Sequence, residues 1–514
     1  MKKTMKRHSF TSQLASLALV FGITLVFASC ANENVAQNLT NTDEDNDKNL
    51  TTFVAGDEAK TRTSMEYYSG NFYWEAGDYI YVKDDNNVWQ RSSNAPTEKV
   101  SFFKFKVPGK FTASSNYKVY YLGKNNTNKR VVISTIQKQT APGNTEHFGE
   151  SGDYGTAIAN KITGKQQFNF ELEHQPAYLV FQPHTYNAIL RRCYLTKIEV
   201  TSDNDIAEGY TINPSTDNLD GSSIGKQIVL TTKSSSGVYT NGFPLAGSGA
   251  GDDRAYMIIK PGTHALMVRY WVRDLVTHVE GTITKLLPSS NYASNTYYDM
   301  TAELDVKNYS EDQYYMWDAE NEYWEGHISD RPLGNGQSNS NYPKSGDNRY
   351  CNTTYPGFGV SNPAINTPCK DLPNVNEMCW YAAKGNPFFD QKELWTTYGR
   401  LYKGGMWFKK KAYISNFRDD QAPDGNDWRT LSKSDSWSAS GGHPDIADAN
   451  KYFFLPCIGF FDRGELKYVG GDGFYWLSSA DPLSSFSAYC VRLGSSVRVG
   501  TDDREYGYRI GTFE

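Results

Sequence analysis

Short runs of β-branched and aromatic residues fill the chain from residue 51 to residue 304, and they constrain the fold more than any other feature. Many runs alternate apolar and polar residues, and turn-forming clusters such as GKNNTNK and AGSGAGDD separate them. This is the pattern of short strands in an all-β fold. A single sandwich takes about 100 residues. We therefore expect two β-sandwiches in tandem, over residues 51–163 and 164–304.

The first 29 residues have the order of a secretory signal peptide. Basic residues precede the apolar run LASLALVFGITLVFA, which is too short to span a bilayer, and small residues lead directly to Cys30. This junction resembles the lipobox of bacterial lipoproteins, which implies a lipid on Cys30. Ordinary cleavage after Ser29 would instead leave a free thiol there. Residues 30–50 are almost entirely polar, so we expect a disordered tether.

The charge balance limits the partners of this chain. It carries 58 acidic and 52 basic side chains, for a net charge of −6. An exported acidic chain lacks the basic surface that nucleic acid requires, and only a lipid on Cys30 would hold it to a membrane. Aromatic residues make up 14 % of the sequence, and Tyr and Trp are common anchors of recognition surfaces.

No group of residues predicts catalysis, a metal or a cofactor. The GSSIG segment at 221–225 has the spacing of a nucleophile elbow, but a strand follows it where that motif needs a helix. The eight histidines include no HExxH motif, and no Cys/His pair has zinc-site spacing. We therefore expect a protein that is not an enzyme.

Seven cysteines are few for a chain of 514 residues, so this is not a disulfide scaffold. Cys193 and Cys457 have apolar neighbours, which favours buried thiols. Pairing of Cys351, Cys369 and Cys379 after export stays open, because spacing does not fix connectivity.

Four segments in the β-rich part follow one another in a recognisable order: KTRTSMEYYSGNFYWEAGDYIYV (60–82), FELEHQPAYLVFQ (170–182), IEVTSDNDIAEGYTI (198–212) and MIIKPGTHALMV (257–268). Together they resemble the fimbrillin family of type V pilins. The resemblance implies two transthyretin-like β-sandwiches, export as a lipoprotein, and assembly with other pilin subunits by strand exchange.

In that exchange a protease removes the first strand and a strand of another subunit fills the groove. The first strand here is expected to be TTFVAG (Thr51–Gly56). Lys60 and Arg62 follow it as possible processing sites, although Arg62 could equally be a surface charge at the start of a strand.

Residues 305–514 have a different texture. The segment YSEDQ (309–313) has few apolar residues to hold it between two cores, so we expect a protease-sensitive linker between about residues 305 and 314. After it, LPNVNEMCWYAAKG predicts a short helix and KGGMWFKKKAYISNF a strand pair.

The order of these elements resembles the C-type-lectin-like fold of the variable proteins of diversity-generating retroelements. The resemblance is carried by Trp428, Arg429, Phe453, Phe454, Leu455, Pro456, Gly459, Tyr475, Trp476, Ser478, Ser479, Ala488, Arg504 and Gly507. It implies an α+β ligand-binding domain. Cys457 stands where Ala is usual, and Gly511 where Arg usually closes the fold. The tripeptides EPN, QPD and WND are absent, so calcium-dependent sugar binding is not expected.

Alternation in the last strands divides their side chains between two faces. Across SAYCVRL, Tyr489, Val491 and Leu493 share a core face, and Cys490 and Arg492 lie opposite. In the resembled proteins the outward positions form the ligand surface. The matched positions, each of which could instead be an ordinary surface or core residue, are Phe474, Leu477, Asp481, Phe486, Cys490, Arg492, Arg498, Asp502, Asp503 and Tyr506.

Taken together, the sequence predicts a surface-exposed lipoprotein of the bacterial outer membrane and its fimbriae. The favoured function is a pilus tip adhesin that binds a protein or glycan on a host or bacterial surface. The alternative is a receptor for glycans or nutrients that Cys30 tethers permanently to the membrane.

Overall fold

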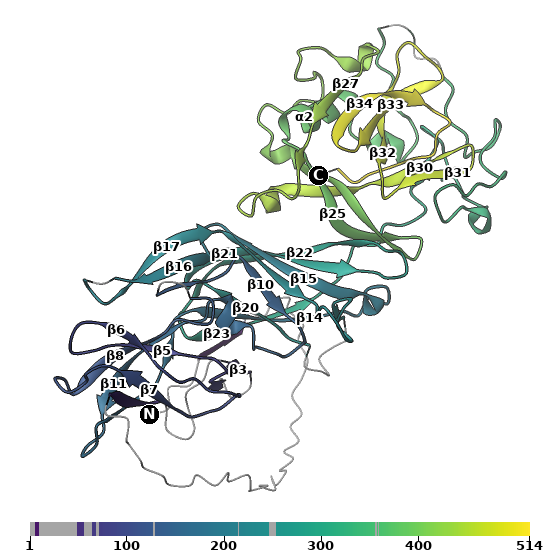
Figure 1. The fold of residues 1–514 in the computed structure, drawn as a ribbon. Coiled ribbons are helices and arrows are strands. Elements are labelled where there is room, and N and C mark those ends of the chain that lie inside the picture. Colours follow the sequence, from purple (N-terminus) through teal and green to yellow (C-terminus); the bar gives the residue numbers. More distant parts are fainter. Residues whose placement is uncertain are drawn as a thin grey trace, which may run out of the picture.

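The computed structural model describes residues 6–9, 49–55, 64–67, 71–126, 129–213, 215–245, 253–354, 357 and 359–513 (Figure 1). Cys30, Lys60 and Arg62 lie outside these residues. Strands dominate, and the two α-helices in the described ranges are α1 (Phe148–Ser151) and α2 (Val375–Lys384). The expectation of a mostly-β chain is confirmed. None of the helices in these ranges has the length and apolar character to cross a membrane.

The first body is built on one large sheet, in which the N-terminal strand β2 pairs with β12, more than 100 residues later in the chain. The main strand order is β6-β5-β8-β11-β12-β2-β7, with β13 (Glu173–His174) beside β11. The bounds are β2 Leu50–Ala55, β5 Ile80–Lys83, β6 Trp89–Arg91, β7 Phe103–Pro108, β8 Asn116–Tyr121, β11 Gly155–Lys161 and β12 Gln167–Phe170. A hairpin of β3 (Ser64–Glu66) and β4 (Asn71–Tyr73) stands apart from it.

The second body has two main sheets that enclose one apolar core. One sheet runs β10-β18-β15-β21-β22, and the other runs β1-β23-β14-β20. The bounds are β1 Lys6–Ser9, β10 Ile136–Gln139, β14 Ala177–His184, β15 Tyr194–Ser202, β18 Gln227–Thr232, β20 Ala255–Ile259, β21 Gly262–Arg273, β22 Glu280–Tyr292 and β23 Thr296–Glu303. A short strand, β19 (Phe243–Pro244), also pairs with β15.

Segments of the two bodies alternate along the chain, so no single residue divides them. The expected boundary at 163/164 falls inside the turn between β11 and β12, which pair with each other in the first sheet. Meanwhile β10 pairs with β18 in the second body, and β9 (Arg130–Val132) joins a small sheet with β16 (Ala207–Ile212) and β17 (Leu219–Gly225). These pairings join segments far apart in the sequence, which local alternation does not reveal.

The C-terminal domain surrounds α2 with short strands and long loops. Asn374 and Glu377 form a capping box at the start of α2, which satisfies two free backbone N–H groups there. One sheet runs β24-β35-β32-β33-β34-β27. The bounds are β24 Tyr314–Tyr315, β27 Asp435–Ser438, β28 Ser440–Gly441, β29 Tyr452–Pro456, β30 Ile458–Asp462, β31 Glu465–Val469, β32 Gly473–Ala480, β33 Ser487–Leu493, β34 Ser496–Asp503 and β35 Tyr508–Arg509.

A hairpin of the C-terminal domain extends the sheet of the second body. The hairpin consists of β25 (Phe388–Thr397) and β26 (Arg400–Lys409), and β25 pairs with β22 where Thr282 meets Glu393. Leu394 and Leu401 of the hairpin belong to the apolar core of the second body. Figure 1 shows β25 reaching toward the end of β22. The C-terminal domain is therefore docked onto the second body.

The segment expected as a loose linker is also held in place. Tyr309 donates its backbone N–H to the carbonyl of Thr396 at 2.8 Å, and Thr397 donates its hydroxyl to the carbonyl of Tyr309 at 2.9 Å. The Arg509 guanidinium donates to the carbonyl of Ser310 at 2.6 Å. These hydrogen bonds hold the segment together with the Tyr309 ring, which packs on Trp395 at a centroid distance of 6.0 Å.

Candidate functional site

Strand β2 is an internal strand of the first body, although it follows the expected tether directly. It pairs parallel with β12 and antiparallel with β7, so both of its edges are occupied. The Phe53 ring is fully buried and stacks on Phe168 with centroids 5.1 Å apart; it also meets Phe111 edge-on at 5.1 Å. Removal of β2 would open a groove between β7 and β12. The strand expected at residues 51–56 is confirmed, with a shift of one residue.

The C-terminal end of the chain is tied into its own domain. Strand β35 pairs with β24, and the N–H of Ile510 donates to the carbonyl of Gln313 at 3.0 Å. The Phe513 ring then packs against the rings of Tyr381 and Phe453, each at a centroid distance of 6.0 Å. Residues 508–513 are therefore not free to pair with another chain.

Strands β32, β33 and β34 lie side by side and carry most of the predicted ligand-binding residues. In one cross-strand row Phe474 faces Arg492, and Arg492 faces Arg498. On the other side of the sheet, the expected core residues Tyr489, Val491, Leu493, Val497 and Val499 are all fully buried in the main core. The predicted division of β33 and β34 into two faces is confirmed.

Four of the ten predicted positions are buried, which differs from the expectation that they face outward. Leu477 lies in the main core, because alternation places it opposite Phe474 and Trp476. Phe474 and Cys490 lie in a second apolar cluster with Trp317, Ala364, Cys369, Phe460, Trp476, Ala480, Ala488 and Tyr508. Asp481 is buried as well. Residues from 317 to 369 cover this part of the outer face, so only its margin reaches solvent.

The margin forms what we call the aromatic–arginine surface: Tyr468, Arg492, Arg498 and Tyr506, with the buried Phe474 ring beneath Arg492. The Tyr468 and Tyr506 rings pack on Phe460, with centroid distances of 6.0 Å and 5.4 Å. The Arg492 guanidinium lies 5.3 Å from the centroid of the Phe474 ring. Rings flank charged side chains here, an arrangement suited to binding a polar ligand that also has an apolar face.

The two arginines of this surface are direct cross-strand neighbours, and both are exposed. Like charges placed directly opposite one another are unfavourable. Asp472 accepts a hydrogen bond from the Arg492 guanidinium at 2.7 Å and offsets one of the two charges. Among the described residues, Arg498 has no ion-pair partner. The pair can therefore receive an anionic group.

Asp502, Asp503 and Tyr506 are partly buried at the other side of the margin. The Asp502 carboxylate accepts a hydrogen bond from the Tyr508 hydroxyl at 2.6 Å. Burial, followed by the charge of Asp502, raises the pKa of the Cys490 thiol well above its usual value. Cys490 is therefore a packing residue in its neutral form.

Tyr468 is a surface residue that alternation did not reveal. It is 52 % exposed and has a left-handed backbone with φ of 62°, which is uncommon for a bulky residue. The available signal was a single Tyr directly before the glycine-rich turn VGGDG. A residue held in this conformation at a surface is a reasonable binding candidate.

Phe486 stands apart on the loop between β32 and β33, with 74 % of its surface exposed. Arg504 holds this loop: its backbone N–H donates to the carbonyl of Phe486 at 2.8 Å, and its side chain donates to the carbonyl of Ser487 at 2.9 Å. The Arg504 guanidinium is itself buried over the Trp317 ring at 4.4 Å. These hydrogen bonds hold the loop in place and keep the Phe486 ring exposed.

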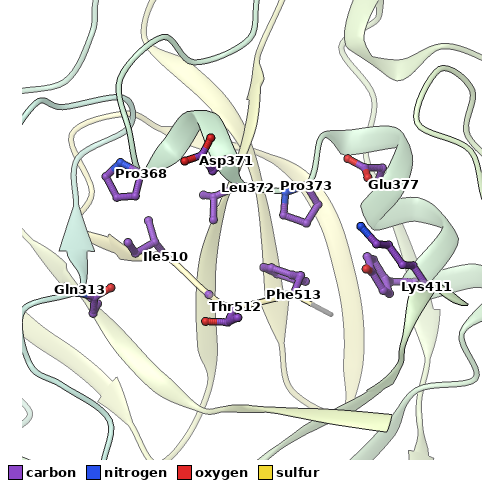
Figure 2. A pocket seen from close by; sticks show the side chains of 12 residues that line it. Gln313, Pro368, Asp371, Leu372, Pro373, Glu377, Lys411, Ile510, Thr512 and Phe513 are labelled. Carbon is purple, nitrogen blue, oxygen red and sulfur yellow. The ribbon is translucent and has the colours of Figure 1, made fainter. Parts of the chain in front are cut away.

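A cavity of about 330 Å³ lies elsewhere in this domain, between the start of α2 and the C-terminal residues (Figure 2). Asp371 and Glu377 line one side, and Ile510, Thr512 and Phe513 line the other. Glu377 already accepts the N–H of Asn374 at 2.8 Å as part of the capping box. None of the ten predicted ligand-binding residues lines this cavity.

All six cysteines within the described ranges are free and buried. The burial expected for Cys193 and Cys457 is confirmed. Cys351, Cys369 and Cys379 form no disulfide, and burial raises the pKa of Cys369 to about 12. The described part of the chain also contains no group of three or more His, Cys, Asp or Glu side chains placed to hold a metal ion.

No family model matches the chain, and no curated protein matches it either. Among solved structures it is similar to a fimbrial protein from Bacteroides ovatus, with 10 % identity and a TM-score of 0.23 over 90 % of this chain and 99 % of that one. It is also similar to the fimbrial anchor protein Mfa2 from Porphyromonas gingivalis, with 12 % identity and a TM-score of 0.22 over 46 % and 82 % of the two chains. Scores this low establish no shared fold, so function must be argued from the residues described above.

Proposed function

We propose that this chain is a cell-surface adhesin that occupies the tip of a pilus. The observation that carries the proposal is the contrast between the two ends of the folded chain. Strand β2 fills an internal position that another strand could take after its removal, whereas β35 and Phe513 are fixed inside the C-terminal domain. A subunit that accepts a strand at the position of β2 and keeps residues 508–513 within its own domain has the polarity of a tip.

Strand replacement in the first body is physically reasonable. Removal of β2 would leave unpaired N–H and C=O groups along β7 and β12 and an apolar gap where Phe53 lay. An extended segment of another subunit with alternating apolar side chains would satisfy both needs. Cleavage after Lys60 or Arg62 would release the strand.

We assign the remaining parts by the resemblance in the sequence. The first two bodies are transthyretin-like pilin domains, and the C-terminal domain is C-type-lectin-like. Lipid on Cys30 holds the exported chain at the outer membrane before assembly, and pilin subunits are its partners.

The aromatic–arginine surface binds the ligand in this proposal. Its arginine pair favours a ligand with an acidic group, and the flanking rings favour a flat apolar face such as that of a sugar or an aromatic side chain. Phe486 supplies a separate exposed anchor. The ligand is therefore an acidic glycan or protein segment on a host or bacterial surface.

The N-terminus of the native protein tests the tip assignment. We expect the mature chain in the pilus fraction to begin after Lys60 or Arg62, and Lys60→Ala with Arg62→Ala to keep it in the membrane fraction with residue 30 at its start. A wild-type chain that begins at Cys30, stays in the membrane and never travels with pilin polymer would instead support the permanently tethered receptor.

A further inference from the structure

The second body has an open seam along one side of its sandwich. Strand β23 pairs with β14 on its inner edge, and on its outer edge only Thr296 to Asp299 are paired, with β1. The outer edge of β23 from Met300 to Glu303 therefore has no strand beside it within the described chain. Strand β22 is also open past Thr282, the single residue at which it meets β25.

An apolar cavity of about 490 Å³ lies between these two open edges, a volume in the range of ligand sites. Val268 and Tyr270 form its floor from β21, and Met300 and Ala302 line the side formed by β23. Leu287, on β22, lines the cavity, is partly exposed and packs against the core of the second body. Lys285, Glu303 and Asp305 also line it. The seam thus combines free backbone groups with unfilled apolar space.

The structure already holds a strand at the start of this seam. Residues 6–9 run parallel to β23, in register from Lys6 at Thr296 to Ser9 at Asp299. A strand that continued in the same direction would pass the free half of β23 and cover the cavity. Residues 6–9 belong to the expected signal peptide, so maturation would vacate the whole edge.

Neither the tether nor the C-terminal residues of this chain suit the vacated place. The tether between residues 31 and 48 is polar and carries few side chains able to fill an apolar cavity. The C-terminal residues are pinned by β24 and by the rings around Phe513. Long, exposed strand edges with apolar side chains readily pair with another chain.

We propose that the seam between β22 and β23 is a second strand-accepting groove, distinct from the position of β2, and that an extended segment of a neighbouring pilin subunit fills it. This inference rests on the proposed pilus function. The segment runs parallel to β23 and places apolar side chains at alternate positions over Met300 and Ala302. The charges of Lys285, Glu303 and Asp305 at the mouth help to set its register.

Hydrogen exchange tests the inference on the signal-cleaved chain, measured alone and within pilin polymer isolated from the same cells. We expect the amides of residues 300–303 that point away from β14 to exchange freely in the chain alone and at least about tenfold more slowly in the polymer. Amides on β7 and β12 report on the first groove in the same experiment.

The readings separate the two proposals. Protection of β7 and β12 on incorporation, without any change along β23, overturns the second groove alone. Absence of the chain from the polymer overturns the pilus function and the second groove together.

A pair of matched variants then tests the cavity. Leu287→Glu places a charge in it, because Leu287 lies opposite Leu266 on the face of the sheet that carries Val268 and Tyr270, and we expect this variant to lose the added protection of residues 300–303. Val276→Glu makes the same change at a 73 % exposed position on the turn between β21 and β22 and should behave as the wild type. Neither position is buried, and melting curves of both variants establish that they fold. Equal protection in the two variants would overturn the role of the cavity.

Discussion

Phe53→Ala tests whether β2 is held as firmly as its proposed role requires. Truncation of a buried Phe to Ala costs about 3–5 kcal/mol of unfolding free energy. Phe53 is fully buried and meets Phe168, Phe111 and Tyr117 at centroid distances of 5.1, 5.1 and 6.5 Å. Each aromatic pair contributes about 0.5–1.5 kcal/mol beyond burial, so we expect a loss in the upper half of that range.

The assay is calorimetric unfolding of the unprocessed chain with residues 50–55 intact. A loss of about 4 kcal/mol should lower the Tm of the transition that contains the first body by about 8–16 °C. Phe486→Ala serves as the control, because exposed positions typically change stability by no more than about 0.5 kcal/mol. A loss below about 1 kcal/mol for Phe53→Ala would refute the view that β2 is a packed internal strand.

Four further predictions concern the C-terminal domain and its junction with the second body. Arg492→Ser with Arg498→Ser should abolish adhesion, while each change alters the free energy of unfolding by about 0.5 kcal/mol or less. Trp476→Ala should instead lower the free energy of unfolding by about 3–5 kcal/mol in a melting experiment. Normal adhesion of the double variant would remove these arginines from the proposed ligand surface. Arg269→Ala should lower the free energy of unfolding by about 3–5 kcal/mol because it leaves the buried Asp390 carboxylate without its ion-pair partner. Arg269→Met with Asp390→Leu should recover most of that loss. An equal loss in the single and double variants would contradict the pairing. Burial raises the pKa of Glu393 to about 8, so its contribution to stability is full below the usual carboxyl pKa and is lost as pH rises toward 8. In Glu393→Gln the denaturation midpoint should therefore depend less on pH over that interval. If the pH dependence of the midpoint is the same as in the wild type, Glu393 is ionised in the folded protein. Limited proteolysis should spare residues 305–314, and early cleavage there would show that the hydrogen bonds of Tyr309 and Ser310 do not hold the segment.

Local alternation predicted the parts of the fold that depend on local geometry. The core faces of β33 and β34 and the position of β2 follow from period-two patterns, and the structure has them. Alternation also places Trp476 on the same face of β32 as Phe474, and Leu477 on the opposite face. The mismatch at Leu477 therefore arose from matching positions to a family pattern.

The remaining differences arise from contacts between distant segments. Alternation placed Phe474 and Cys490 on the outer face correctly, but Trp317, Ala364 and Cys369 cover that face from more than 100 residues away. The pairing of β10 with β18 and of β22 with β25 likewise joins parts that look like separate domains. No pattern within a single strand encodes such a neighbour, and this is why the sequence did not reveal the pairing across 163/164 or the hydrogen bonds that hold residues 309–313.

The docking of the hairpin bears on the proposed adhesin function because the proposed ligand surface and β2 lie in different bodies. Domains joined only by a linker move relative to one another by default, and a ligand pulled at one end would then reorient the binding domain freely. Here β25 adds to the edge of β22, Leu394 enters the core of the second body, and Arg269 pairs with Asp390 at 2.8 Å across the junction. Separating the domains would expose that apolar surface and break a buried ion pair at once. In the proposed adhesin, this junction would hold the aromatic–arginine surface in a fixed orientation on the second body, and load applied to a ligand would pass through the junction toward the first body and β2.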